Sequence, residues 1–320
     1  MITAIRLLLF FALTMLTVWC LFGIFKDEIV IFKFLNFMGQ VVPIFALSLL
    51  IALVWLCRES KLKWLAVAVA LPAMIIPLII SNLSIYKEEL TATNTKSEVS
   101  FSFISFSKMS HNKNYSEIAK VIDCNKYDVI QVQEILDLDN FLAANPTVAD
   151  TCNISVNKKH KQLVTFSAFP VSSYEENGLF LTRVEVAGDL IVSLLNVHAI
   201  KAITSSADRQ TGAVTRYIKL SENIDGPLIV AGDFNATPFN ASVLQMKKHF
   251  NHAQVENHFT NRYSTWPAEG RRLGTLGPWI QIDYIFYQGL KSENTFVHNS
   301  SYGSDHYPIE TSFKIYKEIE

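Results

Sequence analysis

The chain has 320 residues, of which 50% are hydrophobic and 18% are charged, and its mean hydropathy is +0.22. These values are too apolar for a wholly soluble protein and predict a membrane-embedded part. From residue 84 onward, 22 Lys and Arg stand against 26 Asp and Glu. This balance disfavours a protein that covers nucleic acid with a basic surface, although a nuclease with a local basic groove stays compatible with it.

Three uncharged, apolar runs occupy the N-terminal part, at residues 7–25, 34–57 and 64–86. Each run is about as long as a helix that crosses the hydrocarbon core of a bilayer. We therefore predict an anchor of three transmembrane helices within residues 1–86. A cleaved signal peptide in place of the first helix, or a buried hairpin, is the alternative, but no small-residue cleavage site follows the first run.

The positive charges of the short connections predict the orientation of this anchor. Arg6 precedes the first run, and Arg58, Lys61 and Lys63 lie between the second run and the third. Because Lys and Arg in short loops favour the cytoplasmic side, both places should be cytoplasmic. Three crossings then put the rest of the chain outside the cytoplasm, in the periplasm or the extracellular space.

Beyond the anchor, residues 87–98 are polar and predict a linker. Residues 100–106 alternate with period two, as a strand does, and residues 128–133 are typical of a buried strand. Two later runs, 179–186 and 190–197, predict a hairpin, with a helix over 207–221. Strands dominate and the hairpin indicates antiparallel pairing, so the pattern predicts an α+β layered sandwich.

Polar residues that can carry chemistry stand at the ends of several predicted strands. A carboxylate at such a place is costly to bury unless a metal ion or another partner meets it. Each residue alone is more often a cap or turn residue. Together they supply oxygen ligands for Mg²⁺, an amide and two imidazoles, which suits metal-assisted phosphate chemistry. The residues are Glu134, His198, Asp233, Asn235, Asp283, Asp305 and His306.

This ordered set resembles the endonuclease/exonuclease/phosphatase superfamily, which includes pancreatic deoxyribonuclease, abasic-site endonucleases, neutral sphingomyelinases and inositol polyphosphate 5-phosphatases. The most specific parts are Gly-Asp-Phe-Asn at 232–235 and Ser-Asp-His-Tyr-Pro at 304–308. Gln-Glu at 133–134, Asn-Val-His at 196–198 and Ile-Asp-Tyr at 282–284 follow the family's order. The resemblance covers about residues 101–313. The preceding helices resemble a bacterial membrane-anchored subgroup.

The resemblance implies a four-layered α/β/β/α sandwich of two mainly antiparallel sheets, formed by a catalytic domain at residues 99–320. It also implies roles for the matching residues. Glu134 would be the principal ligand of Mg²⁺, with Mn²⁺ as the alternative ion, and Asp305 would assist the metal or the adjacent histidine. Asp233 and Asn235 would orient the attacking water and a phosphate oxygen.

Two histidines are expected to serve the phosphate. His306 would act as a base or contact the phosphate, in a tautomer held by Asp283. His198 would contact the phosphate and stabilise its developing charge. Whether Asp233 or His306 removes the proton from water stays open at this point.

One position departs from the family pattern. After the first predicted strand, family members usually carry Asn, whereas this chain has Ser107 followed by Lys108. Asn112 or Asn114 could replace the missing amide. The departure keeps a domain that binds without catalysing as an alternative to an enzyme.

A predicted loop carries the remaining candidate contacts with substrate. Trp266 and Arg271 belong to a segment that resembles the substrate-side loop of the superfamily. An aromatic ring beside basic residues suits a phosphate-bearing ligand with a flat or apolar part. Simple packing of the Trp-Pro pair is the alternative. Ser107, Trp266 and Arg271 are therefore the predicted substrate contacts.

The four cysteines divide between the two parts of the chain. Cys20 and Cys57 fall within or at the edge of the predicted spans. Cys124 and Cys152 fall in the predicted catalytic domain, where an oxidising compartment would let them pair. Two separate buried thiols are the alternative.

The sequence thus predicts a membrane-anchored, Mg²⁺-dependent hydrolase that cleaves phosphoesters, of the phosphodiester type, by attack of water. Its substrate would be a lipid headgroup, a nucleic acid or a small phosphodiester. An extracytoplasmic nuclease and a catalytically inactive binding domain of the same fold are the alternatives.

Overall fold

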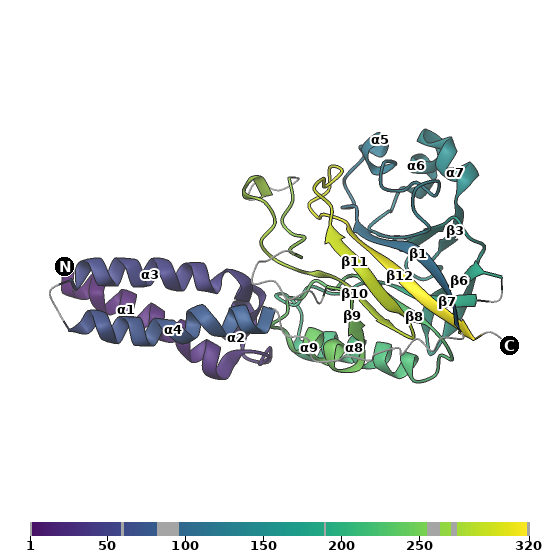
Figure 1. Ribbon diagram of the computed structural model, residues 1–320. Coiled ribbons are helices and arrows are strands. Elements are labelled where there is room, and N and C mark those ends of the chain that lie inside the picture. The colour runs from purple at the N-terminus through teal and green to yellow at the C-terminus, as the bar shows by residue number, and fades with distance from the viewer. Residues whose placement is uncertain are drawn as a thin grey trace.

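The computed structural model describes residues 2–58, 61–81, 96–188, 190–254, 263–269 and 274–318. Most of the predicted linker and the predicted substrate contact Arg271 lie outside these residues. The N-terminal helices form an elongated bundle to one side of a layered domain that contains the strands (Figure 1). The N-terminus lies at the end of the bundle far from this domain.

Three helical stretches are long and apolar enough to cross a membrane: Ile2–Gly23, Gly39–Leu56 and Leu62–Ser81. The elements of this anchor are α1 (Ile2–Val18), the π-helical turn η1 (Trp19–Gly23), α2 (Val30–Phe37), the 3₁₀ turn η2 (Gly39–Val41), α3 (Val42–Leu56) and α4 (Leu62–Ser81). The predicted second run was too long at its start, because residues 34–37 belong to the separate helix α2. In the part of the anchor that the structure describes, there are therefore three candidate spans and one short additional helix.

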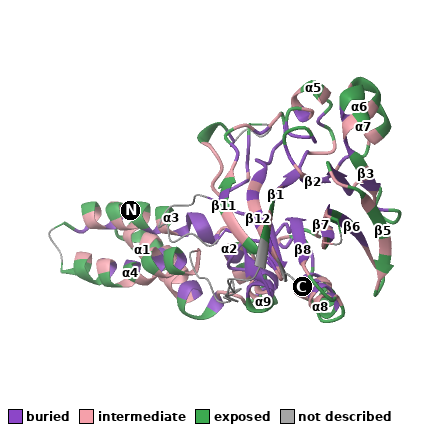
Figure 2. Cartoon of the chain, turned by 45° about the vertical axis from the view of Figure 1, so that its right-hand side comes forward, coloured by how far each residue is buried: buried purple, intermediate pink, exposed green. Residues whose placement is uncertain are grey.

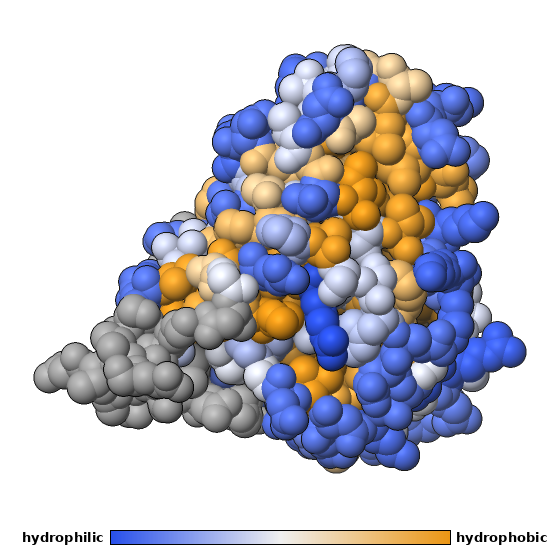
Figure 3. Space-filling view, turned by 90° about the vertical axis from the view of Figure 1, so that its right-hand side faces the viewer, coloured by the Kyte–Doolittle hydropathy of each residue, from blue (hydrophilic) through white to orange (hydrophobic). Residues whose placement is uncertain are grey.

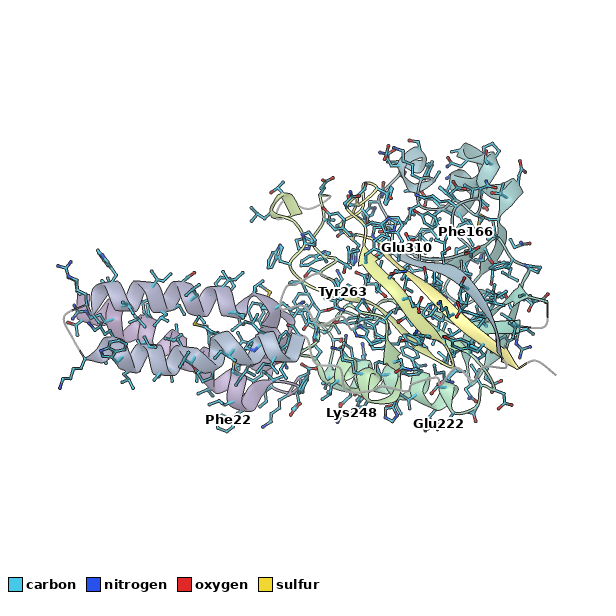
Figure 4. The ribbon with its side chains drawn as sticks, viewed as in Figure 1. Phe22, Phe166, Glu222, Lys248, Tyr263 and Glu310 are labelled. Carbon is cyan, nitrogen blue, oxygen red and sulfur yellow. A yellow bond between two sulfur atoms is a disulfide. The ribbon has the colours of Figure 1, made fainter. Side chains whose placement is uncertain are left out.

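Small side chains let the three long helices pack closely. Ala46, Ala66 and Ala70 are buried between them, as expected where helices associate in a membrane. Many large apolar side chains point outward instead; Phe22, for example, extends away from the bundle (Figure 4). An apolar outer surface of this kind is suited to contact with lipid.

The first sheet has six strands in the order β11-β12-β1-β2-β4-β3, and β1 with β2 is its parallel pair. The strands are β1 (Lys96–Ser107), β2 (Val129–Gln133), β3 (Asn153–Val156), β4 (Val164–Ser167), β11 (Lys291–Val297) and β12 (Ile309–Glu318). Its outer face packs against the layer that contains α5 (Tyr115–Ile118), α6 (Leu138–Ala144) and α7 (Pro146–Thr151). β1 begins at Lys96, so the last three residues of the predicted linker are in a strand.

The second sheet also has six strands, in the order β5-β6-β7-β8-β10-β9, with β7 and β8 parallel. The strands are β5 (Val171–Glu176), β6 (Leu179–Ala187), β7 (Leu190–His198), β8 (Leu228–Asp233), β9 (Asn251–His252) and β10 (Asp283–Gln288). The helices α8 (Ala207–Ser221) and α9 (Ala241–His249) cover its outer face.

The two sheets pack face to face around a hydrophobic core. Phe101, Phe103 and Phe313 of the first sheet meet Val192 and Ile285 of the second. The central strands, such as β8, are accordingly buried, whereas the edge strand β5 is largely exposed and the helices of the outer layers are exposed on one side (Figure 2). At the end of the domain opposite the anchor, hydrophilic residues line the lower and outer margins of the surface (Figure 3). The predicted α+β sandwich of four layers, with mainly antiparallel sheets, is confirmed.

A disulfide bond decides between the two alternatives for the cysteines of the domain. Cys124 and Cys152 are bonded, with their Cα atoms 5.4 Å apart, and they are 28 positions apart in the chain. The bond joins the segment after α5 to the end of α7. It therefore fastens the outer helical layer of the first sheet.

We expect the double substitution of Cys124 and Cys152 by Ser to lower the free energy of unfolding by about 3–4 kcal/mol, because a cross-link across a loop of this length restricts the unfolded chain. Denaturant unfolding of the protein in detergent micelles measures the change. A reductant should lower the stability of the wild type and leave that of the double variant unchanged. Equal stability of the two proteins without reductant would contradict this role.

The stretch between the first span and α3 binds the layered domain; we call residues 24–41 the docking segment. Phe239, between β8 and α9, inserts into the hydrophobic cluster of the anchor, with its ring centroid 5.8 Å from that of Trp19. Gly39 faces the same ring. A Cβ atom at Gly39 would lie 2.4 Å from Cδ2 of Phe239, so this close approach requires glycine.

A buried carboxylate fastens the docking segment to the domain. One oxygen of Asp27 accepts hydrogen bonds from the amides of Asn36 (2.8 Å) and Asn240 (2.9 Å). The other oxygen accepts from the backbone N–H of Ala241 (2.8 Å), the first residue of α9, where a negative charge is favoured. The hydroxyl of Thr237 donates to the carbonyl of Asn36 (2.6 Å). Specific polar contacts thus join the anchor to the loop that follows β8.

Candidate active site

Strand pairing brings several predicted site residues to one edge of the sandwich. β7 and β8 are parallel with His198 opposite Asp233, and β10 is antiparallel to β8 with Asp283 opposite Asp233. Glu134 follows β2 directly, and residues 305–306 lie just before β12. Both sheets therefore contribute to the same edge, as the order of the motifs predicts.

Glu134 has a strained backbone next to the pocket. Its φ of 61° lies in the left-handed region, which costs energy for a residue other than glycine. One carboxylate oxygen accepts a hydrogen bond from the N–H of Ser110 (2.7 Å), and the other lies 3.4 Å from Nε2 of His198. The strain thus turns this carboxylate toward the residues of the second sheet.

Asp233 is fixed by the residues on either side of it. Both of its oxygens accept hydrogen bonds from Asn235, one from the backbone N–H and one from the side-chain amide, at 2.8 Å each. Gly232 has a φ of 142°, and a Cβ atom there would lie 1.9 Å from the carbonyl oxygen of Val197. Glycine is therefore required where β8 passes β7.

His306 is held by a buried carboxylate. Its Nδ1 lies 2.8 Å from Oδ2 of Asp283, an oxygen that also accepts a hydrogen bond from the hydroxyl of Thr265. Its Nε2 faces Asp233 at 4.0 Å. Burial lowers the pKa of His306, but the charge of Asp283 and the hydrogen bond to it outweigh burial and raise the pKa to about 10.

The other two titrating groups respond differently to burial. Burial raises the pKa of the Asp233 carboxyl to about 8, although His306 opposes the increase. Burial lowers the pKa of His198, against the charge of Glu134. At neutral pH, therefore, a cationic imidazole at His306 faces a carboxyl group at Asp233 that titrates close to neutrality.

A pocket of about 490 Å³ opens over these groups. Predicted residues in its wall are Glu134, Asp233, Asn235, Trp266, Asp305 and His306. His198 lines the adjoining pocket, and Asp283 lies behind His306. The structure thus brings every predicted catalytic and metal-binding residue to one place. The predicted contact Arg271 is outside the described residues.

The pocket also contains residues that the sequence did not suggest. Phe37 comes from the docking segment, and His111, Lys201 and Ile203 come from loops. Phe37 carried no signal, because it lies inside an uncharged run that resembles a membrane span. Lys201 stands three residues after His198, and this proximity was the one available hint.

Ser107, the departure from the family pattern, is buried beneath the site. Its hydroxyl has no hydrogen-bond partner among the described residues, and its carbonyl accepts a bond from the hydroxyl of Ser304 (2.6 Å). The amide of Asn112 donates to the carbonyl of Tyr302 (3.0 Å), and its oxygen accepts from the N–H of Asn114 (3.0 Å). Asn112 therefore fastens a loop, and its side chain is not free to replace the family's amide.

The docking segment also supports the loops of the site. Gln40 accepts a hydrogen bond from the N–H of Gln281 (2.6 Å), two residues before Asp283. Lys33 donates to the carbonyl of Ser205 (3.0 Å), in the loop after His198. Together with the contacts of Asp27, these hydrogen bonds join the docking segment to the loops after β7 and β8 and to the loop before β10.

The donor set suits a divalent cation. Two groups of three residues could each hold an ion, because the ligand atoms within a group all lie within 4.8 Å of one another. The first group is Glu134, His198 and Asp233, and the second is Asp233, Asp283 and His306. The side chain of Glu134 is 23% exposed, so its carboxylate is open to the pocket. Carboxylate oxygens are the ligands that Mg²⁺ and Mn²⁺ prefer.

A family model for the endonuclease/exonuclease/phosphatase family matches residues 112–306, which include the whole set of strand-end motifs from Glu134 to His306. The chain belongs to this family. Its members are phosphoesterases, so the chain is a hydrolase that acts on ester bonds. A search of curated protein sequences finds no match.

Solved structures share the fold of this endonuclease/exonuclease/phosphatase domain. A functionally unknown conserved protein from Enterococcus faecalis is 15% identical with a TM-score of 0.52, covering 66% of this chain and 98% of that one. D. rerio TDP2 complexed with a single-strand DNA product is 15% identical with a TM-score of 0.53, covering 67% and 98%. A family protein from Bacteroides thetaiotaomicron is 13% identical with a TM-score of 0.51, covering 68% and 99%. At these identities the likeness concerns the fold alone.

Proposed function

We propose that the chain hydrolyses phosphodiesters at a membrane surface, with Mg²⁺ or Mn²⁺ as its metal ion. The observation that carries this proposal is the pocket in which Glu134, Asp233 and His306 share one wall. Glu134 and Asp305 would hold the ion. When bound there, a divalent cation supplies positive charge that stabilises the phosphate oxygens in the transition state.

The chain's own residues would position and deprotonate the attacking water. Asp233 is held by two hydrogen bonds from Asn235, and burial raises the pKa of its carboxyl to about 8, so its carboxylate takes up a proton more readily than an ordinary aspartate. His306 is cationic and oriented by Asp283, so it would donate to a phosphate oxygen or to the leaving group. His198 would contact the phosphate from the opposite strand.

We further propose that the catalytic domain lies outside the cytoplasm. The Cys124–Cys152 bond supports this location, because such bonds persist in oxidising compartments. The docking segment contacts the domain, so the first connection is on the same side of the membrane as the domain. The N-terminus and the connection carrying Arg58 and Lys63 are then on the other side, in agreement with the positive-inside rule.

The full chain in detergent micelles is expected to hydrolyse bis(p-nitrophenyl) phosphate with Mg²⁺ and to lose this activity when EDTA removes the ion. Asp233→Asn should lower kcat by at least about 100-fold, since the proton acceptor is lost. Asp225→Asn, on an exposed loop, is the matched control and should keep full activity. Released p-nitrophenol is measured by its absorbance.

Two outcomes would replace this proposal with its alternatives. Faster cleavage of single- or double-stranded DNA than of the small diester would favour an extracytoplasmic nuclease. No turnover with any substrate, from a protein that unfolds cooperatively on heating, would favour a binding domain, in line with Ser107 in place of the usual Asn.

A further inference from the structure

The anchor supplies part of the wall of the active-site pocket. Phe37, the last residue of α2, lines the pocket together with Asp233 and His306. Its ring centroid lies 6.3 Å from that of Trp266, with the rings edge to face. The position of the pocket relative to the membrane is therefore fixed by a residue of the anchor itself.

This wall lies close to the start of the second candidate span. Phe37 precedes the second candidate span, Gly39–Leu56, by two residues, and a helical residue advances by only about 1.5 Å. The headgroup region on each side of the hydrocarbon core is roughly 5–8 Å thick. With Gly39–Leu56 across a bilayer, the edge of the pocket at Phe37 lies at the level of the lipid headgroups.

Exposed apolar side chains lie on α2, the helix that ends with Phe37, and on the turn that follows Trp266. Val30 on α2 is 76% exposed, and Ile31 and Phe34 are also exposed. The 3₁₀ turn η3 (Gly274–Leu276) follows Trp266, and its Leu276 is 82% exposed. In Figure 1 this short yellow-green turn extends from the domain to the level of the near end of the bundle. Apolar side chains at that level suit insertion into a membrane interface.

A basic side chain, that of Lys201, lies at the same pocket. His111 and Lys201 are exposed and belong to its lining. The contact of Lys33 with the carbonyl of Ser205 ties the loop of Lys201 to the docking segment (3.0 Å). Cations at the membrane surface attract the phosphate group of a lipid.

We propose that the substrate is a membrane phospholipid, whose headgroup phosphodiester enters the pocket from the leaflet that surrounds the anchor. This inference rests on the proposed function. The oxygen of water bonds to phosphorus as one P–O ester bond breaks, and one proton of the water ends on the leaving alcohol oxygen. The products are a phosphomonoester and an alcohol.

The test uses the full chain reconstituted in vesicles of phosphatidylcholine and phosphatidylglycerol with Mg²⁺, and bis(p-nitrophenyl) phosphate as the dissolved comparison. Mass spectrometry of the lipids detects the phosphomonoester and the alcohol. Leu276→Ser should lower the ratio of phospholipid turnover to dissolved-diester turnover by about tenfold. The substitution removes the apolar contact between residue 276 and the membrane interface. Ile191→Ser, an exposed apolar residue at the end of β7 away from His198, should leave the ratio unchanged.

The outcomes separate this inference from the function on which it rests. Turnover of the dissolved diester without any phospholipid product overturns the lipid substrate and keeps the phosphodiesterase. No turnover of either substrate overturns the phosphodiesterase itself. Phospholipid turnover with an unchanged ratio in Leu276→Ser overturns the entry of substrate from the membrane.

Discussion

Glu134→Gln is expected to lower the turnover of bis(p-nitrophenyl) phosphate at saturating Mg²⁺ by more than about 100-fold. Loss of a residue that hydrogen-bonds to a metal ligand typically lowers metal affinity or activity by about 10–100-fold. Glu134 is the predicted ligand itself, so the effect should be larger. Glutamine keeps the size of the side chain and one oxygen for the N–H of Ser110. The substitution therefore removes the negative charge with little disturbance of the loop.

Metal binding separates this effect from a general loss of structure. Calorimetric titration with Mn²⁺ should show weaker binding by the Glu134→Gln variant, while its thermal unfolding stays close to that of the wild type. Glu117→Gln, a change of the same kind on the exposed side of α5, serves as the control. Wild-type activity in the Glu134→Gln variant would show that the carboxylate of Glu134 is not a ligand of the catalytic metal ion.

Asp27→Ala is expected to lower the free energy of unfolding by about 3 kcal/mol or more. Three donors lose their acceptor, namely the amides of Asn36 and Asn240 and the N–H of Ala241. Each buried donor left unsatisfied costs about 1–3 kcal/mol. Turnover should fall as well, because the loop between Asp233 and α9 loses its support.

The neighbouring residue provides a control for this effect. Glu28 is exposed, so Glu28→Ala changes the charge of the docking segment without removing a buried acceptor. Asp27→Asn keeps one acceptor oxygen and should lie between the wild type and Asp27→Ala. Denaturant unfolding and diester turnover are measured on the same preparations. Identical stability in Asp27→Ala and Glu28→Ala would show that the docking contacts do not hold the domain.

The strand-end residues could be predicted because their chemistry is unusual for their surroundings. Asp233 and Asn235 follow four apolar residues and a glycine, and a buried acid of this kind needs partners. Strand pairing then explains why Asp283 and His198 lie beside Asp233. The fold class followed from the same alternation of strands and helices.

The docking contacts could not be predicted, because nothing local marks them. Asp27 and Asn240 are separated by 213 positions, and each resembles an ordinary turn or cap residue. Phe37 resembles part of a membrane span. The pairing of Cys124 with Cys152 depends on a distance between Cα atoms, which composition does not contain. Contacts of this kind are properties of the folded chain.

The docking segment also imposes an order on biosynthesis. Asp27 leaves the ribosome 213 residues before Asn240, and translation at about 5–20 residues per second makes this interval roughly 10–40 s. During this interval, Asn240 and Ala241 have not yet been made. Of the hydrogen-bond donors described above for the carboxylate of Asp27, Asn36 alone is then present. Insertion of the anchor therefore precedes completion of the catalytic pocket, and the enzyme matures only after its last strands have been made.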